Sequence, residues 1–451
     1  MADNLYFSRD TKLYLEMTTA QGGAGDVWEL PILDGFSFSQ ATNTTEVTLT
    51  EAALPSKQGK SRRSRQMFND SFAPAEWSFS TYMRPFKGAG VAGDGDKRWE
   101  LNAATDAVHS VEEPLWANFV SNPTFTKSAS SAAAAWTAPN LTAASGTVSP
   151  VVNGASSKTI NFKASEASAL GTFNLYFEMG GADALGSEST PFSYKIEDCV
   201  VNEVSIDFDI DGIATLNWSG FGRMITQTST PTSTITEAIE ATNNFIRNRL
   251  TVLNISTAND VLVTDEDPTP GDSTETYDIV LTGGNITFSN NITFLMPETL
   301  GVVNQAIGHV PGTRSISGSF TAYLNNETGA NDESTAELFE RIIESRDSIT
   351  NVFNTRFNIG GIPKLANGNP YTFAASDQGG NYNEPTDDPT VVISMPRCHL
   401  EVPTHSIDDV ISMEMNFHAL PVDIDPATNN SNNVGDYEAL IAYSGPLADN
   451  P

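Results

Sequence analysis

The sequence predicts a mainly β protein built from two tandem, homologous β-sandwich domains, each with one short α-helix. Two observations lead to this class. Apolar and polar residues alternate along many short segments, which places them on opposite faces of β-strands. The first half of the chain shows strand, helix and strand patterns in a certain order, and the second half shows the same order. Each half has about 200 residues, which is an ordinary size for one domain.

The predicted domain boundaries follow from these repeated patterns. The first domain spans residues 1–225 and contains a Ser/Ala-rich excursion at about residues 128–157. Residues 226–244 form a Thr-rich linker, and residues 245–451 form the second domain with a short C-terminal extension. Apolar pairs spaced by four residues predict one helix in each domain, at about residues 110–120 and 333–346.

The clearest repeat begins at the only two cysteines. Residues 199–218 match residues 398–417 without a gap, which places Asn217 on Asn416. Several matches in one order indicate a duplication, and a duplicated chain is usually built for a ring or an array. Three further pairs of segments match in the same order, namely residues 78–83 with 319–324, 115–120 with 338–343, and 177–181 with 357–361.

Period-two alternation predicts the individual strands. In the segment that contains Asp207, Asp209 and Asp211, the acidic residues share one face and apolar residues fill the other. We therefore expect one face to be core and the other to be solvated and acidic. The predicted strands are residues 30–38, 76–83, 173–179, 204–211, 250–255, 277–281, 286–293, 315–324 and 411–418.

The charge of the chain restricts the function classes. The formal net charge is −32, from 24 Lys and Arg against 56 Asp and Glu. Such a field repels phosphate, which argues against a nucleic-acid binder in the usual sense. A surface that must let DNA pass without holding it would carry the sign of DNA. The simpler alternative is that the acidic residues serve solubility alone, or that the protein comes from a salty source that favours acidic surfaces. This alternative stays open here.

The sequence gives no signal for secretion, membrane insertion or disulfides. The N-terminal residues show no positive segment followed by an apolar stretch, and no long apolar run predicts a membrane span. Cys199 and Cys398 each begin an alternating apolar segment. We therefore expect both to be small core residues in a reducing cytoplasm.

Enzyme motifs are few. The five histidines show no metal-ligand spacing, and the Gly-rich segments lack the Lys-Ser/Thr ending of a phosphate loop. No nucleophile, base and orienting residue converge in the sequence. We therefore predict no enzyme activity, no metal and no cofactor.

One strongly basic stretch occupies residues 57–65. Opposite charges set register and speed assembly, so such a loop suits the acidic surface of a neighbouring copy. An ordinary solvated loop is the alternative. The candidate inter-subunit residues are Lys60, Arg62, Arg63 and Arg65.

The segment MFNDSFAPAEWSFSTYMRPFK, residues 67–87, is specific enough to indicate a family. With it, the chain resembles the duplicated major tail tube proteins of long-tailed, non-contractile bacteriophages. The resemblance runs from about Leu13 to Asp425. Other segments that carry it are residues 34–51, 217–220, 283–297, 318–325 and 402–409.

The resemblance implies a tail-tube-type β-sandwich that is used twice. Six such domains make a ring, so three chains would close one ring with pseudo-sixfold symmetry, and stacked rings would form a tube in the virion tail. The subunits would assemble in the host cytoplasm with tape-measure, tail tip and tail terminator proteins, and DNA would pass through an acidic lumen without specific binding. The candidate lumen residues are Asp207, Asp209, Glu414, Glu46 and Glu51.

Two alternatives remain open at this stage. The tube of a contractile tail differs by its sheath partner, which the sequence does not reveal. An acidic β-sandwich adhesion module would need an export signal, and none is predicted.

Overall fold

A computed structural model defines the part of the chain that is described below. It describes residues 6–18, 27–47, 66–87, 108–121, 124–126, 135–137, 157–163, 167–168, 170–180, 191–229, 245–257, 276–296, 306–326, 334–344, 353–361, 389–407, 410–421 and 437–444.

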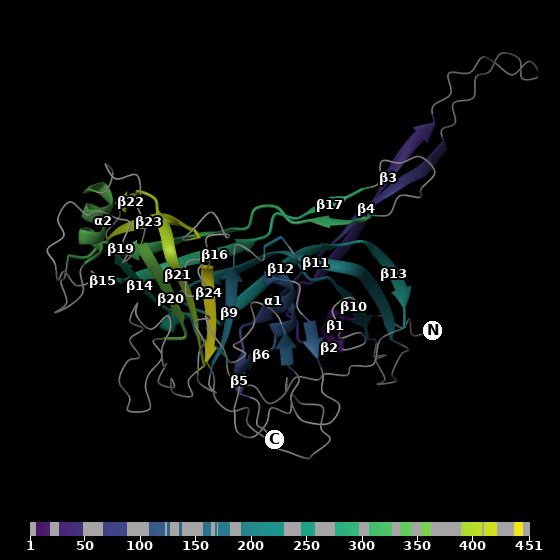
Figure 1. Ribbon diagram of the computed structural model, residues 1–451, viewed down its shortest axis with the longest axis horizontal. Helices are drawn as coiled ribbons and strands as arrows, with labels where there is room; N and C mark the ends of the chain where they lie inside the picture. Colours follow the sequence, from purple (N-terminus) through teal and green to yellow (C-terminus); the bar gives the residue numbers. More distant parts are fainter. Residues whose placement is uncertain are drawn as a thin grey trace, which may run out of the picture.

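The described residues are mostly β-strand, which confirms that the fold is mainly β (Figure 1). Two α-helices occur among them, α1 (Glu113–Val120) and α2 (Thr335–Glu344), and both lie where the apolar spacing predicted a helix. The strands are β1 (Thr11–Met17), β2 (Val27–Leu30), β3 (Ser37–Val47), β4 (Gln66–Tyr82), β5 (Pro85–Lys87), β6 (Val108–Ser110), β7 (Thr124–Thr126), β8 (Ala135–Thr137), β9 (Ser157–Lys163), β10 (Phe173–Met179), β11 (Phe192–Phe208), β12 (Thr215–Gly222), β13 (Met224–Thr228), β14 (Val252–Thr257), β15 (Thr276–Ile279), β16 (Leu281–Ser289), β17 (Thr293–Leu295), β18 (Gly308–Val310), β19 (Ser315–Tyr323), β20 (Phe353–Ile359), β21 (Thr390–Leu400), β22 (Thr404–Ile407), β23 (Ile411–Ala419) and β24 (Tyr437–Ser444).

Eight strands form one antiparallel layer that we call the long sheet. Its pairing order is β3, β4, β12, β11, β16, β19, β23 and β22. The first four strands come from the first half of the chain and the last four from the second half. The hairpin of β3 and β4 projects far from the body of the molecule (Figure 1).

The two halves are joined by two separate strand pairings. In the long sheet, the end of β11 pairs with β16, with Ile206 opposite Ile286. Outside the long sheet, β24 pairs with β21 of its own half and also with β9 of the first half. The largest group of buried apolar residues therefore includes residues from both halves.

The two halves also share details of strand register. Phe173 of β10 faces Cys199 of β11, and Phe353 of β20 faces Cys398 of β21, with a register shift directly after each pair. Both cysteines are fully buried and free, as predicted. The origin of the halves by duplication stays a prediction, which these registers support.

The predicted gapless match of Asn217 with Asn416 is wrong by two residues. Ser205 faces Asn217, whereas Thr404, 199 residues further on (404 − 205), faces Glu414. The reason is the turn, because Ile206 faces Leu216 in the first hairpin while Ile407 faces Ile411 in the second. The second turn is therefore shorter.

Several predicted strands have different bounds in the structure, and three of them have a clear physical reason. Residues 31–36 separate β2 from β3, and Gly35 lies there with φ of +99°. Asn291, with φ of +49°, interrupts the strand predicted at residues 286–293. A left-handed residue turns the backbone away from extended pairing, which hydropathy alternation does not reveal. The strand predicted at residues 204–211 ends at Phe208.

Two boundary predictions also need comment. β13 runs to Thr228, so the first residues of the predicted linker are strand, while residues 230–244 lie outside the described residues. Most of the predicted excursion at residues 128–157 lies outside them too, apart from β8 and the first residue of β9.

Candidate polar face of the long sheet

One face of the long sheet is polar in every strand that crosses it. The opposite face is buried, as the alternating burial of β12 and β23 shows. Cross-strand partners align the polar side chains in rows that run across both halves. One row is Ser37, Ser78, Ser219, Glu203, Ser289 and Ser315. A second is Ser80, Asn217, Ser205, Thr287, Ser317 and His418, and a third is Asp207, Asn285, Ser319 and Asn416.

Short polar side chains on this face are linked by hydrogen bonds. Ser80 Oγ donates to Asn217 Oδ1 at 2.7 Å, and Asn217 Nδ2 donates to Asp207 Oδ2 at 3.1 Å. The hydroxyls of Ser37 and Ser78 lie 2.8 Å apart. Because neighbouring groups are hydrogen-bonded to one another, this face presents short, ordered hydroxyl and amide side chains.

Apart from His418, the ionisable groups in these three rows are acidic. Glu203 and Asp207 stand on β11, and Glu414 lies two residues before Asn416 on the same face of β23. The three rows contain no lysine and no arginine. Carboxylates set among hydroxyls and amides repel phosphate and give a passing polyanion no cation to bind.

The predicted lumen residues have different outcomes. Asp207 and Glu414 share this polar face. Asp209 lies beyond the end of β11, in the turn that contains Gly212 with φ of +125°, because the strand ends at Phe208. Asp211 lies in the same turn, so the predicted common face of the three aspartates is wrong beyond Asp207.

Of the remaining predicted site residues, only Glu46 lies in the described part of the chain. Glu46 is an exposed residue of β3, opposite Met67 on β4. Glu51 and the basic residues lie between these strands, outside the described part of the chain, so their roles stay predictions. The basic set is Lys60, Arg62, Arg63 and Arg65.

The sequence prediction missed Glu203 and most of the hydroxyl and amide groups. Glu203 precedes Ser205 and Asp207 in the same period-two pattern, so the alternation alone could have included it. The Ser, Thr and Asn residues carry no charge signal, and only their alignment across six strands shows that they form one surface.

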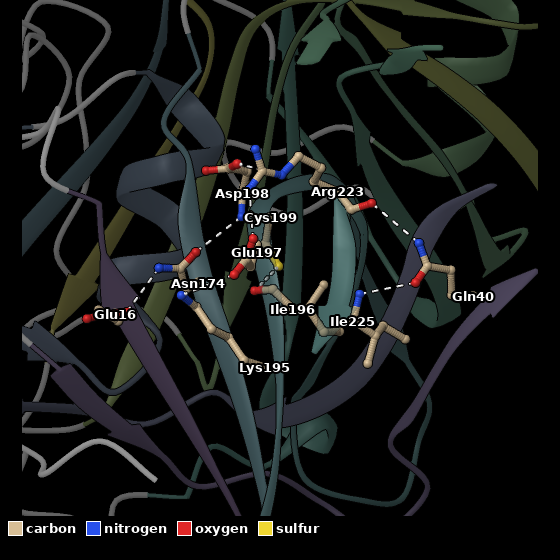
Figure 2. A network of polar contacts seen from close by, with 10 residues as sticks. All are labelled: Glu16, Gln40, Asn174, Lys195, Ile196, Glu197, Asp198, Cys199, Arg223 and Ile225. Atoms are coloured by element: carbon tan, nitrogen blue, oxygen red, sulfur yellow. Dashed lines mark hydrogen bonds and ion pairs between the residues drawn. The ribbon is translucent and has the colours of Figure 1, made fainter. Parts of the chain in front are cut away.

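A network of polar contacts holds the edge of the long sheet in place (Figure 2). The amide of Gln40, on β3, receives a hydrogen bond from the Ile225 backbone N–H at 3.1 Å and donates one to the Arg223 carbonyl at 3.4 Å. The Arg223 guanidinium also pairs with Glu197 at 2.7 Å. The edge strand β3 is therefore fastened to β13 of the other layer through a side chain.

The projecting hairpin exposes apolar side chains. Met67 and Phe68 on β4 are about half exposed, and Phe72 lies further along the same strand with a similar exposure. Monomeric proteins rarely present several such side chains together without a partner. The hairpin therefore has the character of a contact element.

Neither a metal-ligand cluster nor a membrane-spanning helix occurs in the described part of the chain. No group of three or more His, Cys, Asp or Glu side chains among them could hold a metal ion. The helices within the described ranges are too short and too polar to cross a membrane.

Comparison with known proteins adds one informative relative. No protein-family model matches the chain. The tail tube protein pb6 of Escherichia phage T5 is 27% identical over 429 residues, which cover 94% of this chain and 74% of pb6. Phage T5 is a long-tailed siphovirus. A similarity of this extent, together with the mainly β fold, supports a structural and non-enzymatic tail tube protein, as the sequence resemblance predicted.

Proposed function

We propose that this protein is the major subunit of the tail tube of a non-contractile phage tail, in which three chains close a ring and rings stack into a hollow tube. The observation that carries the proposal is the long sheet. It passes without interruption from one half of the chain to the other, and at both ends it has a strand with one unpaired edge among the described residues.

Closure of a ring would pair these two edges with strands of neighbouring copies. An interface that joins different surfaces of identical copies makes a ring when its rotation closes, and strand pairing around the ring removes exposed edges. Two similar halves per chain would give three chains pseudo-sixfold symmetry. The shared registers at Cys199 and Cys398 support two similar halves.

In this arrangement the polar face lines the lumen. Its hydroxyls, amides and carboxylates would let DNA slide past without specific binding. The projecting hairpin, with its exposed Met67 and Phe68, would contact the adjacent ring, and the basic residues that follow β3 in the sequence would meet acidic surface there. Tape-measure, tail tip and tail terminator proteins are the partners that such a tube requires in the virion, with assembly in the host cytoplasm.

Electron microscopy and mass photometry of the purified protein test the proposal. Rings of three chains or hollow tubes are expected, formed either spontaneously or on an added tail tip complex. A stable compact dimer that forms no rings under either condition would refute the tube subunit and favour a binding module.

A charge reversal tests the lumen assignment separately. Asp207→Lys should leave tube assembly intact, because the side chain is exposed, and should make the tubes retain a labelled DNA duplex at low salt. Asp207→Asn removes the negative charge without adding a positive one, and serves as the matched control. Equal DNA retention by tubes of Asp207→Lys and of the unmodified protein would place this face outside the lumen.

A further inference from the structure

The two helices are held at their ends in different ways. α2 has a capping box of its own, because Ser334 Oγ donates to Glu337 Oε2 at 2.9 Å and the Ser334 backbone N–H donates to the same oxygen at 2.6 Å. The hydroxyl of Thr335 also donates to the Tyr323 carbonyl of the same half. α2 therefore obtains its N-terminal partners from its own half of the chain.

α1 lacks a comparable cap from its own half. Glu112 occupies the N-cap position without a side-chain hydrogen bond to the helix, and the last turn contains no basic residue. Isolated helices shorter than roughly 12–15 residues are marginal in water, because they form too few hydrogen bonds to offset nucleation. All residues of Glu113–Val120 are nevertheless buried. The ends of α1 must therefore be satisfied by other parts of the molecule.

Two buried side chains of the second half complete the C-terminal end of α1. Asn290 Nδ2 donates to the Phe119 carbonyl at 3.0 Å. Arg314 Nη2 donates to the Val120 carbonyl at 3.0 Å, and Arg314 Nε donates to Asn290 Oδ1 at 3.1 Å. A cation beside the last carbonyls also suits the negative end of the helix dipole. The second half therefore supplies the C-terminal cap for the helix of the first half.

β24, also from the second half, stabilises groups at both ends of this helix. The Tyr443 hydroxyl donates to the carboxyl group of Glu112, directly before α1. At the other end, burial lowers the pKa of Arg314, and the carboxylate of Glu438 opposes this shift from the start of β24. Two side chains of one strand therefore act on opposite ends of α1.

β9 belongs to the first half but depends on the same strand. Within the described residues β9 pairs only with β24, and Ile160 faces Ile441 in this pairing (Figure 1). The ring of Phe162 on β9 lies 6.0 Å from the Trp116 ring and 5.6 Å from the guanidinium carbon of Arg314. Departure of β24 would therefore remove the backbone partner of β9 and the side-chain partners of α1 together.

We propose that α1, β9 and β24 form one closing unit that spans the two halves. α1 and β9 become ordered only when β24 and the side chains of Asn290 and Arg314 are in place. Because β24 follows every other described element in the sequence, a chain under synthesis holds this part of the first half open until β24 is added. The unit is a property of the single chain, whether or not copies assemble into a tube.

Hydrogen exchange of the full chain at increasing guanidinium concentration, followed by mass spectrometry, tests the closing unit. Amides that belong to one cooperative opening share its free energy and its denaturant dependence. Residues 113–120, 157–163 and 437–444 should therefore exchange together. β1 and β10 of the first half should open in a separate, less frequent step. Exchange of α1 in the same step as β1 and β10 overturns the proposal.

Arg314→Met tests the cap directly, because it removes the donors and keeps a long apolar side chain beside Phe162. Exchange of α1, β9 and β24 should become faster by roughly tenfold or more, with α2 unchanged. Ser334→Ala is the matched control, since it removes the cap that α2 receives from its own half and should speed exchange in α2 alone. Unchanged exchange of α1 in Arg314→Met, or an equal change in all elements, contradicts the closing unit.

The order of closing is tested by pulsed hydrogen exchange during refolding of the unmodified full chain, which does not depend on the folding of any variant. α1 and β9 should gain protection in the same kinetic phase as β24. Protection of α1 in an earlier phase than β24 would show that the first half closes its helix without the second half, and would overturn the proposal.

Discussion

At the scale of single residues, a buried polar cluster connects the two halves of the chain. Trp116 Nε1 donates to the Tyr443 hydroxyl at 2.8 Å, and that hydroxyl donates to Glu112 Oε1 at 2.9 Å. Trp116 and Glu112 belong to the start of α1 in the first half, and Tyr443 belongs to the C-terminal strand β24. The cluster therefore connects the last strand of the chain to the helix of the other half.

Tyr443→Phe should destabilise the folded chain, because it leaves the indole N–H and the Glu112 carboxyl without this partner in a buried site. Loss of a buried hydrogen-bond partner costs about 1–3 kcal/mol. Denaturant unfolding followed by tryptophan fluorescence measures the change in the free energy of unfolding. Tyr323→Phe, at an exposed tyrosine of β19, is the control, and an equal effect of both variants would contradict the role of the cluster.

Glu112 should make stability depend on pH. Burial raises the pKa of Glu112 to about 7 from its ordinary value of 4.5. Between these two values the folded chain holds the proton and the unfolded chain does not, so stability falls as pH rises through this window. The contribution of Glu112 is full below pH 4.5 and is lost above about pH 7, with a slope of about 1.4 kcal/mol per pH unit.

The comparison with Glu112→Gln isolates this contribution from the other carboxylates. Unfolding midpoints at about pH 5 and about pH 8 should differ less in the variant than in the unmodified protein. An unchanged pH dependence in Glu112→Gln would show that other groups cause it.

At the scale of elements, β11 takes part in both layers of the first half and in one of the two pairings that join the halves. Its first part pairs with β10 and β13, and its second part pairs with β12 and β16. A strand that contributes to both layers has to bury side chains along its whole length. Buried residues of β11 do recur from Ser193 to Phe208. The end of β11 carries Phe208 into the core of the second half.

Phe208→Ala should cost about 3–5 kcal/mol of folding free energy, as expected for the removal of a buried phenylalanine. Thermal or denaturant unfolding of the isolated chain measures this loss. Ile407 lies 199 residues after Phe208, which is the spacing of the two cysteines, and is 81% exposed. Ile407→Ala should therefore change the unfolding free energy by less than about 0.5 kcal/mol. Similar losses in both variants would mean that Ile407 is already covered in the isolated chain.

At the scale of the whole molecule, a formal net charge of −32 opposes the association of copies. Screening weakens repulsion between exposed charges beyond a Debye length, which is about 10 Å at about 0.1 M salt. An acidic subunit therefore assembles against a long-range repulsion that its short-range strand pairing must exceed.

Raising the NaCl concentration from about 0.05 M to about 0.5 M should therefore speed tube assembly. Light scattering on samples of equal protein concentration measures the rate, and sucrose of matched osmolality serves as the control. Slower assembly at high salt would instead show that attraction between the basic loop and acidic surface dominates.

The sequence by itself determined the mainly β character of the fold, the two helices, the buried cysteines and the polar face that contains Asp207 and Glu414. These features depend on local alternation and spacing, which are visible along one segment without knowledge of the strands that pair with it. It did not determine the end of β11 before Asp209, because a turn near Gly212 interrupts the alternation. The joining of the halves, the rows of hydroxyls and the contrast between covered Phe208 and exposed Ile407 were decided by tertiary structure alone, because pairing between distant strands depends on register, and register is a property of both strands.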